Sequence, residues 1–432
     1  MDELTKYGEA VLERLPELPG GPELLDLAGV REDVELVGGA ARDVLLGRAP
    51  RELDVVVAGD AHSFACELAA SLGVPAEADP ITGAGIAVHE RFGTALVWWQ
   101  AGRIDIASRR TEQYHSPGAL PEVRAGSGEE DLARRDFTVN AIAILLGGSR
   151  RGELSTVAYA LEDLTAGRLR VLHDRSFLDD PTRLLRLARY LARLGFEPEE
   201  HTAELAAGAL GAGALGTVSG ARTGRELRLA LAEQDAVGAL AKMSELGVLS
   251  ALHPQLRFPE AVARRALELL PSDGRADLLL LGSLLLSIAQ RSTEDPERAA
   301  IGLLDELKFT APDRDRATRT ALLAHTLVQD LQDADTPSEL REVAGAAAIE
   351  TVALAGALAE AEGLANATST ASRWLSELRH VRLQITGDDL LAAGVPPGPE
   401  IGDRLELALR RRLDGDLPEG REAELNAAME GM

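Results

Sequence analysis

The stretch that decides the fold is residues 36–57, LVGGAARDVLLGRAPRELDVVV. The glycine pair Gly38-Gly39 ends one apolar run, and the acids Glu52 and Asp54 open the next. Because alternate residues of a strand point to the same face, the two carboxylates are predicted to project together. Parallel carboxylates repel each other unless a cation lies between them. The pattern therefore predicts a metal-binding strand beside a glycine turn that admits a phosphate.

Three further polar residues extend this candidate site. Arg42 and Asp43 follow the glycine pair, and Arg42 is a candidate clamp for a triphosphate because its planar fork suits phosphate oxygens. Asp105, in RIDIAS, lies on another predicted strand and is a candidate third metal ligand. Each signal also has a plain structural explanation, a strand-to-helix turn for the glycines and a solvated strand face for the acids.

Bulk composition limits the classes of protein that this chain can represent. It has 432 residues, 45% of them hydrophobic, which predicts a globular protein of several domains. The net charge of −25 argues against nucleic-acid binding by the whole surface and leaves room for a local arginine-lined groove. Cys66 is the single cysteine, so an intramolecular disulfide is excluded. The absence of an apolar run of roughly 18 residues predicts no membrane partner, and we expect a cytoplasmic location.

The pattern of residues predicts an α+β head followed by a long helical part. Short β-branched runs are frequent up to Leu146, whereas Leu/Ala/Arg runs at helical spacing dominate afterwards. We also expect a loop at 115–128, a helix after Asn140 and a continuous helix over 338–362. The predicted domains are an N-terminal helical segment, a catalytic head, a helical neck, a helical body and a helical tail, at 1–30, 31–148, 149–250, 251–380 and 381–432.

After the glycine element and the acid pair, a third polar cluster lies in residues 131–141, DLARRDFTVNA. Arg135 is the candidate contact for a phosphate or ribose, and Asn140 is a candidate partner of the sugar. Asp136 is included as a nucleotide-binding candidate. The competing interpretation, slightly favoured by this segment alone, is helix capping by Asp136 or Thr138 with ordinary salt bridges.

The fourth cluster, residues 179–189 with sequence DDPTRLLRLAR, offers a way to select a nucleobase. Cytosine and adenine both present an amine beside a ring nitrogen, so the Asp180 carboxylate could accept from the amine while Arg183 donates to the nitrogen. Uracil and guanine would leave that carboxylate unpaired, which discriminates strongly in a buried site. Arg186 and Arg189 continue the same helix. The alternative is Asp180 as helix cap with the arginines on a wet face.

In this order the four elements closely resemble the class II tRNA nucleotidyltransferase family, which includes CCA-adding, CC-adding and A-adding enzymes and bacterial poly(A) polymerase. The resemblance covers nearly the whole chain. After the opening stretch, the segments that carry it are IDIASRRTEQYHSPGALPEV, EEDLARRDFTVNAIAI, LEDLTAGRLRVLHDRSFLDDPTRLLRLARYLARLGF, VSGARTGRELRLAL and ITGDDLLAAGVPPGPEIG.

The resemblance implies a polymerase-beta-type nucleotidyltransferase head, with neck, body and tail gripping the acceptor arm of tRNA. It implies Mg²⁺ as cofactor, with Mn²⁺ able to substitute, and CTP and ATP as substrates. The residue roles that it implies are metal ligation by Glu52 and Asp54, nucleotide contact by Gly39, Arg42 and Arg135, base reading by Asp180 and Arg183, and support by Arg186 and Arg189. The family usually has aspartate where Glu52 stands.

Sequence alone therefore favours template-independent addition of C and/or A to the 3′ end of tRNA. The reaction would release pyrophosphate and would use a two-metal mechanism. Two alternatives stay open: a poly(A) polymerase acting on generic RNA, and a relative that binds RNA or nucleotide without catalysis. The motifs leave open the choice among CCA, CC and A, the RNA-contacting residues, and whether the protein is a monomer or a homodimer.

Overall fold

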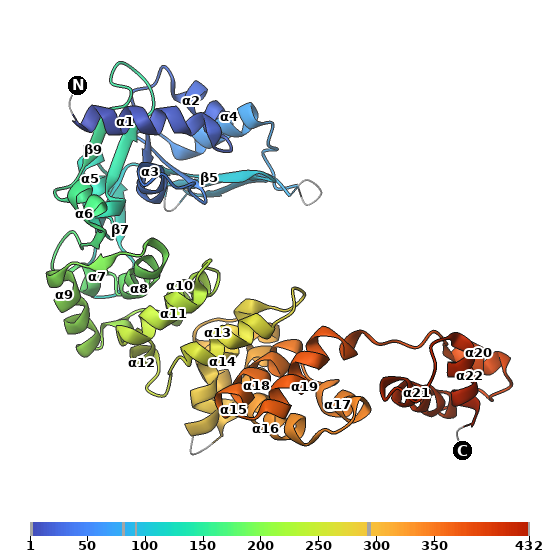
Figure 1. The fold of residues 1–432 in the computed structure, drawn as a ribbon. Coiled ribbons are helices and arrows are strands. Elements are labelled where there is room, and N and C mark those ends of the chain that lie inside the picture. Colours follow the sequence, from blue (N-terminus) through green and yellow to red (C-terminus); the bar gives the residue numbers. More distant parts are fainter. Residues whose placement is uncertain (1–2, 80–82, 91–92, 292–294, 431–432) are drawn as a thin grey trace. The chain divides into compact units, whose positions relative to one another are not determined.

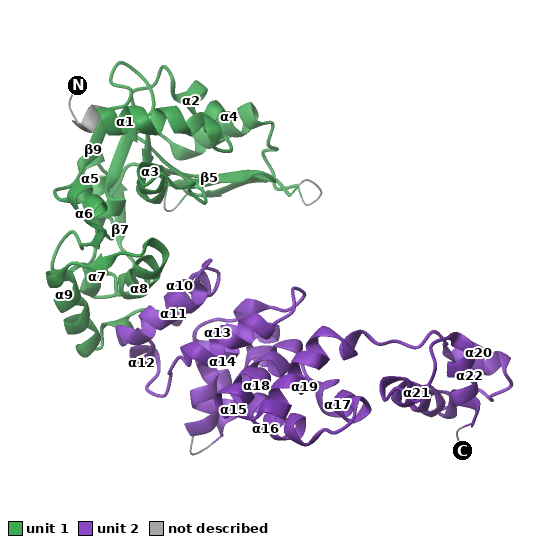
Figure 2. Ribbon diagram, in the orientation of Figure 1, with its two compact units in different colours: residues 1–219 green, residues 220–432 purple. Residues whose placement is uncertain are grey.

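The computed structural model describes residues 3–79, 83–90, 93–291 and 295–430. The chain forms two compact units, residues 1–219 and 220–432, shown in different colours in Figure 2. Each unit is considered by itself. The first holds all the candidate residues named above, so the site is a property of that unit. The finer domain boundaries inferred from the sequence remain predictions.

The first unit is built on a seven-stranded sheet with strand order β3-β4-β5-β2-β1-β8-β9. Its strands are β1 (Val34–Val37), β2 (Leu53–Val57), β3 (Gly85–His89), β4 (Thr94–Trp99), β5 (Gly102–Ser108), β8 (Ile142–Leu145) and β9 (Leu154–Thr156). Only β2 and β5 run parallel; the other neighbours are antiparallel. This parallel pair places Asp54 directly opposite Asp105, which brings two predicted ligands together.

The strands predicted from sequence in the first 108 residues are confirmed, since β1 to β5 all fall on the expected runs. They form because their apolar side chains are buried; Val34, Leu36 and Ile104, for example, have no exposed surface. Helices that pack on the sheet or on each other are α1 (Glu3–Arg14), α2 (Gly21–Ala28), α3 (Gly38–Leu45) and α4 (Ala61–Leu72), seen in Figure 1. Asp60 caps α4 at its N-terminus, as its place before an apolar helix favours.

Three expectations about local structure are wrong. The run after Asn140 is strand β8, not a helix; a short, fully buried apolar segment has the same pattern in either structure. The expected loop at 115–128 contains β7 (Glu122–Ala125), which pairs with β6 (Arg110–Gln113) in a hairpin. The expected helix at 338–362 is two helices, α17 (Pro337–Ala344) and α18 (Ile349–Ala361).

The rest of the first unit is mainly helical and carries the arginine-rich segment. Its helices are α5 (Gly128–Ala133), α6 (Ala160–Ala166), α7 (Ser176–Asp179), α8 (Thr182–Leu194) and α9 (Glu200–Gly211). A two-residue parallel bridge joins β10 (Arg168–Leu169) to β11 (Glu197–Pro198). Helix α8 confirms the helix predicted for the arginine-rich segment, and it buries leucines together with Arg183 and Arg189.

The second unit contains only helices among its described residues. They are α10 (Gly220–Leu231), α11 (Ala236–Glu245), α12 (Val248–Leu252), α13 (Glu260–Leu269), α14 (Ala276–Arg291), α15 (Pro296–Glu306), α16 (Ala311–Asp333), α17, α18, α19 (Ala365–Ser376), α20 (Gly387–Ala392), α21 (Glu400–Leu413) and α22 (Arg421–Glu430). No single described helix is long and apolar enough to cross a membrane. The bent pair α17–α18 meets that criterion jointly, although α18 is buried against α13, α16 and α19.

Candidate active site

Three acids meet at one end of the parallel pair of strands. Glu52 stands immediately before β2, Asp54 is within it, and Asp105 is on β5. Each offers one carboxylate oxygen, and these oxygens lie within 4.8 Å of one another. Hard divalent cations take carboxylate oxygens at such sites. The three residues therefore form a group that could hold a metal ion, and they are the acids that the sequence singled out.

The charge of Asp54 is poorly compensated. Burial raises the pKa of its carboxyl group most, and the charges of Glu52 and Asp105 raise it further, to about 7. Arg135 and the backbone amide of Ala40 act in the opposite direction but do not cancel the effect. A cluster of this kind is a place where an added cation is stabilised, because it relieves repulsion between carboxylates.

The glycine turn brings an arginine to the acids. Gly38 has φ +66°, in the left-handed region that favours glycine. A Cβ added there would lie 2.7 Å from Nη1 of Arg135 and 3.7 Å from Oδ2 of Asp54. A Cβ on Gly39 would lie 3.6 Å from the same Asp54 oxygen. Gly38 is therefore needed both for the backbone conformation and for the close approach of Arg135, whereas a side chain at Gly39 would make only ordinary van der Waals contacts.

Arg135 is held in place without using all of its hydrogen-bond donors. Its Nη2 donates to Oδ2 of Asp131 at 3.0 Å, and Nε is buried with no partner among the described residues. A buried donor without an acceptor is costly, so it is a candidate for satisfaction by a ligand or an ordered water. Arg135 thus fits an anionic group placed beside Asp54.

Arg42 and Asp43 lie behind the turn rather than on its open side. Arg42 is only 1% exposed; its Nε and Nη2 donate to Oδ1 of Asp43 at 2.8 and 2.6 Å, and Nη1 donates to Oδ1 of Asn140 at 2.5 Å. Arg193 donates to the other oxygen of Asp43 at 2.9 Å. Arg42, Asp43 and Asn140, which are nucleotide-binding candidates from the sequence, are buried beside the turn, and their contact with a nucleotide remains a prediction.

Asp136 links the third and fourth clusters. Its Oδ2 accepts two bonds from Arg186 at 2.8 and 2.6 Å, and its Oδ1 accepts from Nδ2 of Asn140 at 2.9 Å. Burial alone would raise the pKa of Asp136, but Arg186, Asn140 and Arg183 together hold it well below its ordinary value. The Phe137 amide also donates to Asp136 at 2.9 Å, but neither Asp136 nor Thr138 caps a helix, because the short 3-10 helix Thr138–Asn140 has no side-chain cap bond and a strand follows it.

The proposed base reader is anchored at the start of α8. Oδ1 of Asp180 accepts from the amide and hydroxyl of Thr182 at 3.1 and 2.6 Å, which is cap-like chemistry. Arg183 is buried, and it donates to Oγ of Ser176 at 2.6 Å and to the Arg134 carbonyl at 2.7 Å. Arg189 lies over the Tyr190 ring at 5.0 Å. Pro181, not Asp180, occupies the N-cap position of α8, so the helix-cap alternative for Asp180 is not confirmed.

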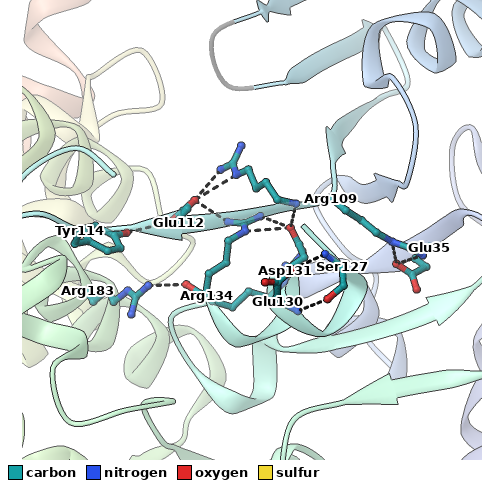
Figure 3. A network of polar contacts seen from close by, with 11 residues as sticks. Glu35, Arg109, Glu112, Tyr114, Ser127, Glu130, Asp131, Arg134 and Arg183 are labelled. Atoms are coloured by element: carbon teal, nitrogen blue, oxygen red, sulfur yellow. Dashed lines mark hydrogen bonds and ion pairs between the residues drawn. The ribbon is translucent and has the colours of Figure 1, made fainter. Parts of the chain in front are cut away.

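Sequence reasoning missed the residues that tie the β6–β7 hairpin to this site. Figure 3 shows Glu112 of β6 facing Arg134, which donates to it at 3.0 Å; the Tyr114 hydroxyl also donates to Glu112 at 3.0 Å. The Arg134 carbonyl in turn receives the bond from Arg183 described above. The alternation of charged and uncharged residues in RTEQY, just before the predicted loop at 115–128, was the available signal.

Comparisons with known proteins agree with this geometry. Residues 34–170 match the family described as Poly A polymerase head domain. The matched region thus contains the acids, the glycine turn and Arg135, and the segment with Asp180 and Arg183 lies shortly after it.

Full-length comparisons extend the resemblance beyond the head domain. An A-adding tRNA nucleotidyltransferase of Geobacter sulfurreducens is 32% identical over 416 residues, which cover 91% of this chain and 45% of the relative. One of Halalkalibacterium halodurans is 41% identical over 229 residues, 52% of this chain and 51% of the relative. The chain spans about half the length of these curated relatives. The Thermotoga maritima CCA-adding enzyme complexed with tRNA superposes with TM-score 0.73 at 26% identity, over 98% of this chain and 97% of that one.

The resemblance inferred from the sequence is confirmed by these comparisons, and so is the α+β fold with a helical remainder. The structure brings Glu52, Asp54, Asp105 and Arg135 together in the head domain. It places Arg42, Asp43, Asp136 and Asn140 behind them as buried supports. The individual nucleotide-binding roles of these residues remain predictions.

Proposed function

We propose that the protein adds C and/or A nucleotides to the 3′ end of tRNA without a template, using CTP or ATP and releasing pyrophosphate. The observation that carries this proposal is the three-carboxylate cluster of Glu52, Asp54 and Asp105 beside Arg135. One element takes a cation and the other takes a phosphate, which are the two requirements of nucleotidyl transfer. The names of the curated relatives support tRNA as the acceptor.

The donor set fits Mg²⁺, with Mn²⁺ as a substitute, because all three ligating groups are carboxylates and none is histidine or cysteine. A bound pair of such ions would activate the terminal ribose hydroxyl and stabilise the leaving pyrophosphate. Glu52, Asp54 and Asp105 would hold that charge in place. Arg135 would orient the triphosphate, with Gly38 and Gly39 allowing its phosphates to approach the backbone.

Base choice would lie at the start of α8. Asp180 accepts from an exocyclic amine and Arg183 donates to the adjacent ring nitrogen, which suits cytosine and adenine alike. Arg183 is preoriented by its bonds to Ser176 and to the Arg134 carbonyl, so little side-chain entropy is lost when it binds a base. Arg186 and Arg189 would support this reader from the next turns of the helix. Buried groups left unpaired by uracil or guanine would reject those bases.

The direct test is nucleotide incorporation by the purified chain. tRNA transcripts ending before, within and after the CC sequence are offered with labelled CTP or ATP, in Mg²⁺ or Mn²⁺. The acceptor that is extended identifies the product as CCA, CC or A. No incorporation on any acceptor with either metal would refute the proposal, provided that circular dichroism shows a folded protein.

The name of the matching head-domain family favours a second candidate, a poly(A) polymerase acting on generic RNA. The same assay separates the two through product length, since a poly(A) polymerase makes long A tails on RNA without a tRNA fold. A third candidate, binding without catalysis, is tested by Glu52→Asp. Turnover that appears only in this variant would identify the natural chain as a catalytically decayed relative.

A further inference from the structure

Two neighbouring strands carry a cluster of charged side chains around the candidate metal site. In the parallel β2–β5 pair, Asp54 is opposite Asp105 and Leu53 is opposite Ile104. Alternate residues share a face, so Arg103 is on the same face of β5 as Asp105, one step toward the strand start and beside Glu52. The cluster therefore contains three acids and one arginine, and Arg103 is not among the site residues predicted from the sequence.

Arg103 contacts two of the three candidate metal ligands. Its Nε lies 3.0 Å from Oε2 of Glu52, and its Nη2 lies 2.6 Å from Oδ2 of Asp105. Burial lowers the pKa of Arg103, but Asp105, Glu52 and Asp54 together raise it overall, so the guanidinium stays charged. One side chain thus joins the same two carboxylates that a divalent ion would join.

The contacts of Arg103 can be released without any change in the fold. Its backbone is fixed in the sheet, where it pairs with Trp98 of β4. Its side chain, however, is 46% exposed, and all three acids of the cluster are also partly open to solvent. An exposed ion pair of this kind is worth at most about 1 kcal/mol, and rotation of the long side chain into water breaks it.

We propose that Arg103 is a built-in counterion of the metal site, which holds Glu52 and Asp105 when no metal is bound and turns away when a divalent cation enters. The guanidinium and the cation compete for the same carboxylates, and their like charges repel. Arg103 therefore weakens metal binding and limits the repulsion among the acids in the metal-free state. The inference rests on the proposed function only in taking this cluster as the metal site.

The test measures metal binding directly, without substrate. Binding of Mn²⁺ is followed by the electron paramagnetic resonance signal of the free ion, and binding of Mg²⁺ by calorimetry, for the natural chain and for Arg103→Gln. Loss of the competing ion pair should lower the dissociation constant about two- to fivefold. Arg103→Lys keeps the charge but cannot bridge two carboxylates, so its affinity should lie between the two.

Arg150→Gln is the matched control, because Arg150 is an exposed head-domain arginine whose ion pair is with Glu153. It changes net charge equally and should leave the dissociation constant unaltered. An unchanged or weaker affinity in Arg103→Gln, with melting temperature preserved, would overturn the inference; weaker binding would show that Arg103 orients the ligands instead.

Asp54→Asn separates this inference from the proposed function. If the natural chain binds Mn²⁺ and Asp54→Asn does not, the cluster is the metal site, and the Arg103 variants then decide the counterion role alone. If Asp54→Asn binds Mn²⁺ as well as the natural chain does, the metal site itself is misassigned and both the inference and the proposed function fail.

Discussion

Two regions of the first unit treat their carboxylates in opposite ways. One is the acid cluster of Glu52, Asp54 and Asp105, and the other is the arginine network in which Asp136 bonds to Arg186 and Asn140. In the cluster, Arg103 pairs directly with two of the three carboxylates, Glu52 and Asp105, and the pKa of Asp54 is raised to about 7. In the network, Asp136 is paired with Arg186 and Asn140, and its pKa is held well below its ordinary value.

The difference shows how each region contributes. The acid cluster is left with unbalanced negative charge, so it is ready for a cation. The network is internally balanced, because the Asp136 carboxylate is satisfied by Arg186 and Asn140. Acids of the first kind are expected to serve function at a cost in stability, and acids of the second kind are expected to serve stability.

The largest effect is expected from a substitution in the acid cluster. Asp54→Asn should reduce nucleotide incorporation by at least about 10³-fold, because it removes a charge at the centre of the metal cluster. The same variant should melt no lower than the natural chain in metal-free buffer, since the lost charge is unfavourable in the folded state. Asp174→Asn, at an exposed acid paired with His201, is the control and should change neither quantity. A large drop in melting temperature for Asp54→Asn would contradict the comparison.

In the arginine network, by contrast, removal of an acid is expected to lower stability. Asp136→Ala should lower the free energy of unfolding by about 3–5 kcal/mol, because it strips the buried partner from Arg186. Asp273→Ala, which breaks an exposed pair with Arg379, should cost far less, because solvent screens that pair. Urea unfolding of both variants and the natural chain provides the comparison, and equal costs would refute it.

The contribution of Asp136 should also depend on pH with a definite sign. Its folded pKa lies below that of the unfolded chain, so the unfolded state binds more protons as pH falls below about 4. The stabilisation is therefore complete above that pH and is lost as acid is added. The difference between the natural chain and Asp136→Ala should shrink when unfolding is measured from pH 5 down to pH 3; a constant difference would show that Asp136 acts by packing alone.

A smaller effect is expected where the two regions meet the nucleobase. Arg183→Ala should lower the preference for CTP or ATP over UTP or GTP by about 10²-fold in kcat/KM, since the donor to the ring nitrogen is gone. The exposed Arg175, paired with Asp179, supplies the control variant Arg175→Ala, which should keep the preference. An activity loss that is equal for all four nucleotides would assign Arg183 to structure rather than base reading.

The smallest effect concerns the turn that joins the regions. Gly38→Ala and Gly73→Ala both place alanine at positive φ, which costs about 1–2 kcal/mol of stability. Only at Gly38 does the new Cβ press on Arg135, because nothing lies within 4 Å of the Cβ position at Gly73. We therefore expect the nucleotide KM to rise about tenfold in Gly38→Ala alone, as the arginine is displaced. The same KM in both variants would show that Arg135 does not contact the nucleotide.

The sequence by itself determined the early strands, helix α8 and the set of acids, because period-two and helical patterns are local and strong there. It also identified the glycine pair and the order of motifs that carries the family resemblance. It failed where local pattern is ambiguous: Ile142–Leu145 is apolar at every position, so only its place between β1 and β9 makes it a strand.

Tertiary structure alone decided which polar residues face the site and which lie behind it. Arg42 and Arg135 look alike in the sequence, yet one is buried against Asp43 and Asn140 while the other abuts Gly38 near Asp54. The role of Arg103 became visible only when parallel pairing placed β5 beside β2. Such contacts join residues far apart in the chain, and burial and charge balance depend on the whole set of neighbours, which no local pattern encodes.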